Sequence, residues 1–276
     1  VGIWNDVFLS ATEAVTISDP LVNTTLADGK ATMTPSVFVK NHLSTPVQGT
    51  LRGNIGDICF EKEVILGANS ETEIVFSPEE YRQLAGQHMK LWWPNGYGEP
   101  YMYSAAYTFH SPQTKSVARM EYQTGIRQVT YKDEMSRLQL YINGQRFIPL
   151  GGNWGFSENH LNYRGREYDI AVGYHRQMNC TMIRNWVGQT GDEEFYEACD
   201  RHGIMVWQDF WLANPVDGPN PFNESMFVAN AEDYLKRIRN HPSIGLYCGR
   251  NEGNPPQSLN DELVRLVAEL HPGLYY

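Results

Sequence analysis

The sequence predicts two structural classes in succession, an all-β module followed by a module of alternating strands and helices. Short apolar or alternating runs, separated by turn signals, fill the first half with almost no helical periodicity. From about residue 147 onward, strand and helix patterns alternate, which is typical of parallel strands joined by crossover helices. The 276 residues suffice for one large domain or two ordinary ones.

The first module shows strand patterns at residues 37–39, 73–76 and 137–141. Turn signals separate such runs, at Asp28-Gly29, residues 54–56 and Asn95-Gly96. This spacing predicts an antiparallel sandwich of roughly immunoglobulin size, with a jelly roll as the alternative. The pair Asn143-Gly144 lies between two apolar runs and predicts a two-residue hairpin.

The second module contains four strand–helix units. The expected strands are residues 147–152, 181–184, 204–207 and 244–248, and the expected helices are residues 167–178, 192–202, 231–239 and 258–270. We expect Asp192 to cap the second helix, Gly203 to end it, and residues 258–261 to form a capping box. Four such units fit either a doubly wound sheet or half of an eight-stranded barrel.

Composition excludes several classes of function. The net charge of −10 argues against nucleic acid or an anionic membrane as a partner. No signal peptide opens the chain, and no apolar run approaches the roughly 18 residues of a membrane helix. The four cysteines form no CxxC pair and are expected to be buried free thiols, and the histidines form no HExxH motif. Neither a P-loop nor a GxGxxG motif is present, so we expect no metal and no cofactor.

Polar and aromatic residues follow every expected parallel strand. They are Asn153 and Trp154, then residues 184–186, then Gln208 and Asp209, and finally residues 250–252. In parallel α/β folds, ligands bind at these carboxyl ends of the strands. Amides, a guanidinium, carboxylates and indoles together suit a neutral, hydroxyl-rich ligand such as a sugar. Each residue alone also fits a structural role as a helix cap, an ion-pair partner or a core side chain.

Residues 244–256 resemble the acid/base region of family 2 glycoside hydrolases, in the branch of β-mannosidases, endo-β-mannosidases and exo-β-glucosaminidases. Residues 2–7 resemble the end of that family's sugar-binding domain. Further similar motifs follow in the family's order, at residues 91–98, 125–127, 178–186, 192–196 and 206–211. The resemblance implies a remnant of the sugar-binding domain at residues 1–12, an immunoglobulin-like β-sandwich at 13–127, and the first half of a TIM (β/α)8 barrel at 128–276.

The resemblance also implies roles for individual residues. Glu252 would be the general acid/base and Asn251 would hold the region of the sugar 2-hydroxyl. Arg184 would orient the nucleophilic carboxylate, and Trp186 and Asp209 would line the sugar subsite, with Asn153 and Trp154 at the mouth of the first strand. A carboxylic acid suits this chemistry because a glycosidic oxygen leaves poorly until it is protonated.

In the family the nucleophilic glutamate would end a strand near the seventh, whereas this chain stops after the fourth unit. We therefore expect a fragment that is inactive alone, from a parent that hydrolyses β-mannosides or related β-linked sugars with retention. Its expected partner is a glycoside substrate, and exposed barrel edges predict self-association. The residues do not specify a cellular compartment; a periplasmic or secreted parent protein is compatible with them.

The alternative is a non-catalytic carbohydrate-binding or structural module with a small doubly wound domain. In that case Trp92 and Trp93 would be exposed to glycans. Burial of this pair in the sandwich core is the competing expectation. The order of the four parallel strands discriminates between the two interpretations, because a doubly wound sheet reverses its strand order.

Overall fold

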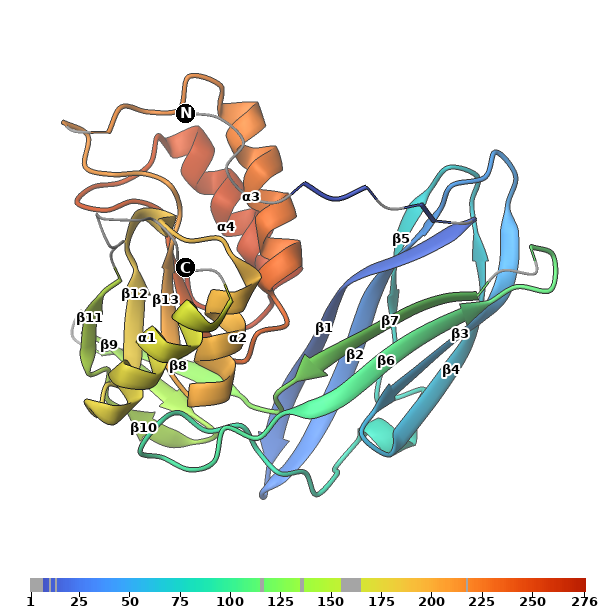
Figure 1. Ribbon diagram of the computed structural model, residues 1–276, viewed down its shortest axis with the longest axis horizontal. Helices are drawn as coiled ribbons and strands as arrows, with labels where there is room; N and C mark the ends of the chain where they lie inside the picture. The colour runs from blue at the N-terminus through green and yellow to red at the C-terminus, as the bar shows by residue number, and fades with distance from the viewer. Residues whose placement is uncertain are drawn as a thin grey trace.

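The computed structural model describes residues 7–9, 11–12, 14–114, 117–134, 137–154, 165–216 and 218–276. The motif expected at residues 2–7 lies outside these ranges except for Val7. Figure 1 shows a body built mainly of strands beside a second body in which helices flank a sheet. No helix in the described ranges has the length and apolar character needed to cross a membrane.

The first body consists of two antiparallel sheets whose inner faces form one apolar core. Their strand orders are β1-β2-β5 and β4-β3-β6-β7. Gly53 shows how closely the residues on the inner faces pack, since a Cβ at this position would lie 2.2 Å from the Phe60 ring. The seven strands are β1 (Val15–Ala27), β2 (Lys30–Asn41), β3 (Val47–Ile55), β4 (Ile58–Leu66), β5 (Glu71–Val75), β6 (Tyr103–His110) and β7 (Val117–Thr124), with a 3-10 turn, η1, at Arg82–Leu84.

A small antiparallel sheet connects the first body to the second. Its strands are β8 (Val129–Glu134), β9 (Arg137–Ile142) and β10 (Gln145–Phe147), in the order β10-β9-β8. Ile142 pairs with Gln145, so the turn consists of Asn143 and Gly144, with φ of 51° and 80°. The predicted hairpin is confirmed, because both residues adopt the positive φ that a type I′ turn requires.

The second body is a parallel sheet with the order β11-β12-β13-β14. An all-β region followed by a parallel α/β region is therefore confirmed, and the strand order shows no reversal among the described strands. The strands are β11 (Gly151–Asn153), β12 (Met182–Asn185), β13 (Met205–Asp209) and β14 (Ile244–Cys248). The helices are α1 (Arg166–Gln177), α2 (Glu193–His202), α3 (Glu224–Ile238) and α4 (Gln257–Leu270), with a 3-10 turn, η2, at Trp186–Gly188.

The two faces of the parallel sheet have different partners. Ile183 and Val206 belong to a core cluster that contains buried residues of all four helices. Met182, Met205 and Leu246 belong instead to a cluster with side chains of β8, β9 and β10. Because successive strand residues point to opposite faces, the helices cover one face and the small sheet covers part of the other.

The start of α3 and the caps of α2 and α4 differ from the sequence prediction. Helix α3 begins at Glu224 rather than at residue 231, with the Asn223 side chain accepting from the Met226 amide at 3.0 Å. The predicted capping box is wrong: α4 begins at Gln257, and the Ser258 hydroxyl donates to Glu224 instead. Asp192 precedes α2 but its carboxylate accepts from the Tyr168 hydroxyl rather than from the backbone. Gly203 ends α2 in the left-handed conformation as predicted.

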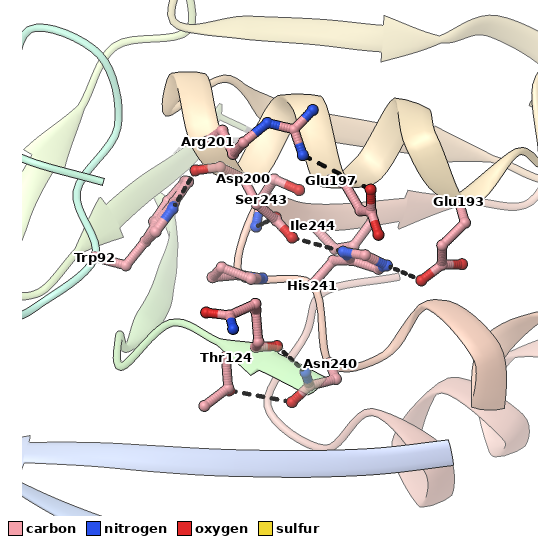
Figure 2. A network of polar contacts seen from close by, with 12 residues as sticks. Trp92, Thr124, Glu193, Glu197, Asp200, Arg201, Asn240, His241, Ser243 and Ile244 are labelled. Atoms are coloured by element: carbon pink, nitrogen blue, oxygen red, sulfur yellow. Dashed lines mark hydrogen bonds and ion pairs between the residues drawn. The ribbon is translucent and has the colours of Figure 1, made fainter. Parts of the chain in front are cut away.

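Polar contacts, one of them buried, join the two bodies (Figure 2). The Trp92 side chain is fully buried, and its indole N–H donates to the carbonyl of Asp200 at 2.9 Å. Its burial was expected, but it packs with the small sheet and the parallel strands rather than in the sandwich core. The Asn240 amide donates to the Gln123 carbonyl of β7, and its oxygen accepts from the Thr124 hydroxyl. The segment before β14 is thereby attached to the sandwich.

The imidazole of His241 lies between two carboxylates of α2 (Figure 2). Its Nδ1 is 2.6 Å from Asp200 Oδ2, and its Nε2 is 2.9 Å from Glu193 Oε1. Burial alone lowers the pKa of this imidazole, but the two carboxylates, Asp200 first, outweigh burial and raise it to about 10. His241 is therefore charged at neutral pH and links α2 to the segment that enters β14.

Candidate active site

Three polar side chains meet at the carboxyl ends of β12, β13 and β14. The Arg184 guanidinium binds the Asp209 carboxylate through Nε, at 3.0 and 3.2 Å, and through Nη2, at 2.7 Å. The same Nη2 donates to Asn251 Oδ1 at 2.9 Å. Arg184 is aligned with Trp207 in the sheet, and its guanidinium lies 5.1 Å from the centre of that indole ring. Hydrogen bonds, charge and ring stacking thus fix the guanidinium in one orientation.

The ion-paired side chains of Arg184 and Asp209 are buried to different extents. The Asp209 side chain has no exposed surface, whereas 22% of the Arg184 side chain is exposed. Within the described residues, the Arg184 side chain donates only through Nε and Nη2, and no hydrogen bond uses Nη1. Asp209 therefore neutralises the guanidinium on its buried side, and Nη1 remains available as a donor to a bound group.

Glu252 follows Asn251 directly and is exposed. Among the described residues its carboxylate forms no ion pair with Arg184, which pairs with Asp209 instead. Its backbone has a φ of 50°, in the left-handed region that a glutamate rarely occupies. Asn251 is 7% exposed. Its backbone N–H donates to the Leu212 carbonyl at 2.9 Å, and this bond anchors the start of the turn. A strained residue on an anchored turn is a recurrent feature of functional sites.

Cys248 is the other reactive side chain close to these groups. Burial, and after it the negative charge of Asp209, raises the pKa of its thiol. The thiol form therefore dominates at neutral pH, and a thiol is a poor nucleophile compared with a thiolate. The cluster is suited to binding and to proton transfer by a carboxyl group rather than to cysteine chemistry.

Comparisons with known proteins show which family this chain resembles. The profile of Glycosyl hydrolases family 2 matches residues 15–127. A mannosylglycoprotein endo-beta-mannosidase of Lilium longiflorum is 30% identical over 98% of this chain, and a beta-mannosidase B of Aspergillus terreus is 30% identical over 91%. The chain belongs to glycosyl hydrolase family 2. It spans only 30% and 29% of the lengths of these two relatives.

Two solved structures share the fold of this family 2 chain. The beta-D-mannosidase of Dictyoglomus thermophilum superposes over 100% of the chain with a TM-score of 0.77 at 24% identity, covering 36% of that protein. The exo-chitosanase of Amycolatopsis orientalis superposes over 95% of the chain with a TM-score of 0.81 at 20% identity, covering 31% of that protein. Both likenesses concern the fold alone.

The two residues expected at the first strand of this family 2 chain have different positions, since Asn153 is aligned with Arg184 in the sheet whereas Trp154 packs in the helix-facing core. Asn153 is exposed on β11, the strand at one edge of the sheet. The Trp154 indole is buried in the helix-facing core, 5.2 Å from the Phe195 ring, whereas its backbone N–H donates to the Arg184 carbonyl at 2.7 Å. The placement of Trp154 therefore gives it a packing role rather than a surface for a sugar. Trp186, in η2, is partly exposed beside the cluster.

Other polar residues at the strand ends are structural. Asn185 and Gln208 point to the helix side, where the Gln208 oxygen accepts from the Tyr196 hydroxyl at 2.7 Å and from the Asn185 amide at 3.0 Å. Arg250 is buried and donates to the Ala213 and Gly218 carbonyls, which fixes the loop after β13. Sequence reasoning did not select Trp207, although strand alternation places it on the same face as Asp209.

Proposed function

We propose that this chain is part of a retaining glycoside hydrolase that acts on β-mannosides or related β-linked sugars, with Glu252 as the general acid/base. The observation that carries the proposal is the convergence of Arg184, Asp209 and Asn251 at three neighbouring strand ends, with Glu252 as the next residue. A carboxyl group in this position protonates the glycosidic oxygen and later removes a proton from the attacking water.

The binding roles follow from donors and acceptors. Asn251 Oδ1 accepts from Arg184, so the Asn251 amide group is left to donate to the region of the sugar 2-hydroxyl. Arg184 Nη1 would donate to the nucleophilic carboxylate supplied by a later strand. Trp186 would offer its partly exposed ring to the sugar, and Asn153 would bind at the mouth of the first strand.

We further propose that residues 13–127 form an immunoglobulin-like sandwich and residues 128–276 the first half of a TIM barrel. The sequential strand order and the gathering of all four helices on one face support the half barrel. A doubly wound module would need a reversed strand order, with helices on both faces. The chain alone would lack the nucleophile, so we expect it to be inactive without the rest of the barrel.

The test uses the intact parent protein and 4-nitrophenyl β-mannoside. Glu252→Ala should lower kcat by about 10²–10⁴-fold, which is the usual contribution of a general acid/base. Azide should restore turnover and yield a β-mannosyl azide, because an anion attacks the glycosyl–enzyme without needing a general base. The control is Glu262→Ala, which removes an exposed glutamate of α4 that pairs with Arg265. Full activity of Glu252→Ala, or turnover by the present chain alone, would contradict the proposal.

A further inference from the structure

We propose that Asp209 is a positioning residue, whose buried carboxylate sets the orientation of both loops that present Trp186 and Glu252. The inference rests on the proposed function, and it replaces the expected role of Asp209 as part of the sugar subsite. A side chain with no exposed surface does not contact a bound sugar. Its effect on the reaction therefore passes through the groups that it holds.

The first group is the turn after β12. Val187 has φ of 46° and ψ of 28°, a left-handed conformation that is unfavourable for a β-branched residue. Its backbone N–H donates to Asp209 Oδ2 at 3.0 Å. Gly188 is also left-handed, and a Cβ there would lie 2.9 Å from the Asp209 carbonyl oxygen. The turn thus packs directly on Asp209, and the carboxylate holds the strained peptide that follows Trp186.

The second segment is the loop after β14, which carries Asn251 and Glu252. Asp209 acts on this loop through Arg184. Arg184 Nη2 lies between Asp209 Oδ2, at 2.7 Å, and Asn251 Oδ1, at 2.9 Å. The position of the guanidinium therefore determines where the Asn251 side chain is held. Glu252 is the next residue in the chain, so a shift of Asn251 also moves Glu252. One carboxylate thereby links the turn after β12 to the loop after β14.

An asparagine at position 209 tests this link because it keeps the shape and removes the charge. Asp209 Oδ2 accepts from Arg184 Nε, Arg184 Nη2 and the Val187 amide, and Oδ1 accepts from Arg184 Nε. An amide group has only one oxygen, so its NH2 must face an Arg184 or a Val187 donor. When the amide oxygen takes the place of Oδ2, the Val187 N–H and Arg184 Nη2 keep an acceptor, and the NH2 faces Arg184 Nε, so the guanidinium loses one Nε contact and its countercharge.

The first experiment uses the present chain and needs no activity. In Asp209→Ala, which removes both carboxylate oxygens, hydrogen exchange followed by NMR should show the Val187 amide exchanging at least about 10-fold faster than in the unaltered chain, as expected for a local opening. The Val206 amide, which donates to the Ser243 carbonyl at 2.7 Å, provides the internal control. Unchanged protection of Val187 in a folded variant would overturn the proposal.

The second experiment measures kinetics in the intact parent. Asp209→Asn should lower kcat by about 10²-fold, as misplacement of reacting groups does, with little change in KM. If Asp209 acts through Arg184, adding Asp209→Asn to Arg184→Lys should cost much less than it does in the unaltered enzyme. A large rise in KM with kcat unchanged, or fully additive effects, would contradict the positioning role.

Two further variants keep the test decisive. Asp200→Asn also removes a buried carboxylate from an ion pair, but its partner is His241 at the interface with the sandwich. It should lower the melting temperature while kcat stays unchanged at temperatures where the protein is folded. If Asp209→Asn does not fold, Asp209→Glu keeps the charge but displaces both oxygens, and it should likewise lower kcat with little change in KM. If the parent hydrolyses no β-glycoside, the proposed function fails, whereas the exchange experiment still tests the positioning.

Discussion

Replacing Asp200 by asparagine should destabilise the chain more than any single surface substitution. The Asp200 side chain is 5% exposed and forms an ion pair with His241, and its second oxygen accepts from the Ser243 amide at 3.1 Å. Removing one partner of a buried pair leaves the other charge uncompensated, which typically costs about 3–5 kcal/mol. In a chain of this size such a loss lowers the melting temperature by roughly 10 °C.

The pH dependence of stability gives a second measure of the same interaction. The pKa of His241 is about 10 in the folded chain, against an ordinary value of 6.5. Since the folded value is the higher one, the stabilisation is complete below about pH 6.5 and is lost as the pH rises through about 10. The difference between the two pKa values corresponds to about 5 kcal/mol, which agrees with the loss expected from the substitution.

Urea unfolding, followed by circular dichroism between pH 6 and pH 10.5, tests both statements. At pH 6, the urea midpoint of Asp200→Asn should be clearly lower than that of the unaltered chain. The difference between the two midpoints should become smaller toward pH 10.5. The matched control is Asp169→Asn, because Asp169 also pairs with a histidine and with Arg201 but is 45% exposed. It should cost less than about 1 kcal/mol. Equal urea midpoints for Asp200→Asn and the unaltered chain would refute the reasoning.

Two other predictions concern packing and association. Gly53→Ala should destabilise the sandwich by about 1–3 kcal/mol through overpacking against Phe60, whereas Gly152→Ala, where a Cβ meets nothing within 4 Å, should be neutral in thermal unfolding. The chain should also self-associate in sedimentation velocity, since the edge strand β11 is exposed and Leu150 beside it is 53% exposed. Leu150→Lys should shift it toward the monomer, and a monomer at every concentration without that substitution would count against edge pairing.

Local signals in the sequence were sufficient to predict turns and helix ends whose conformation depends on neighbouring residues. The hairpin at Asn143-Gly144 and the end of α2 at Gly203 were predicted correctly, because both depend on backbone conformations that few residues adopt. The strands of the α/β region were found from their short apolar runs. The start of α3 was missed because its first turns are partly exposed and carry little apolar periodicity.

The sequence also selected the strand ends as the place of a site, because parallel strands bring these ends to one edge of the sheet. Only the tertiary structure separated their roles. Arg184 and Asp209 lie on the open face and bind one another, whereas Asn185 and Gln208 point to the helices and form a buried network. The polar residue types are similar in both sets, and which face each one occupies depends on strand register and bulges.

What the sequence determined by itself is therefore the order of structural classes, the family resemblance and a short set of candidate residues. Tertiary structure decided that Asp209 is buried beneath Arg184, that Trp154 and Trp92 pack in cores, and that His241 is charged between two carboxylates. The physical reason is that burial and charge pairing arise between segments far apart in the chain. Such long-range contacts leave no periodic pattern in the residues that make them.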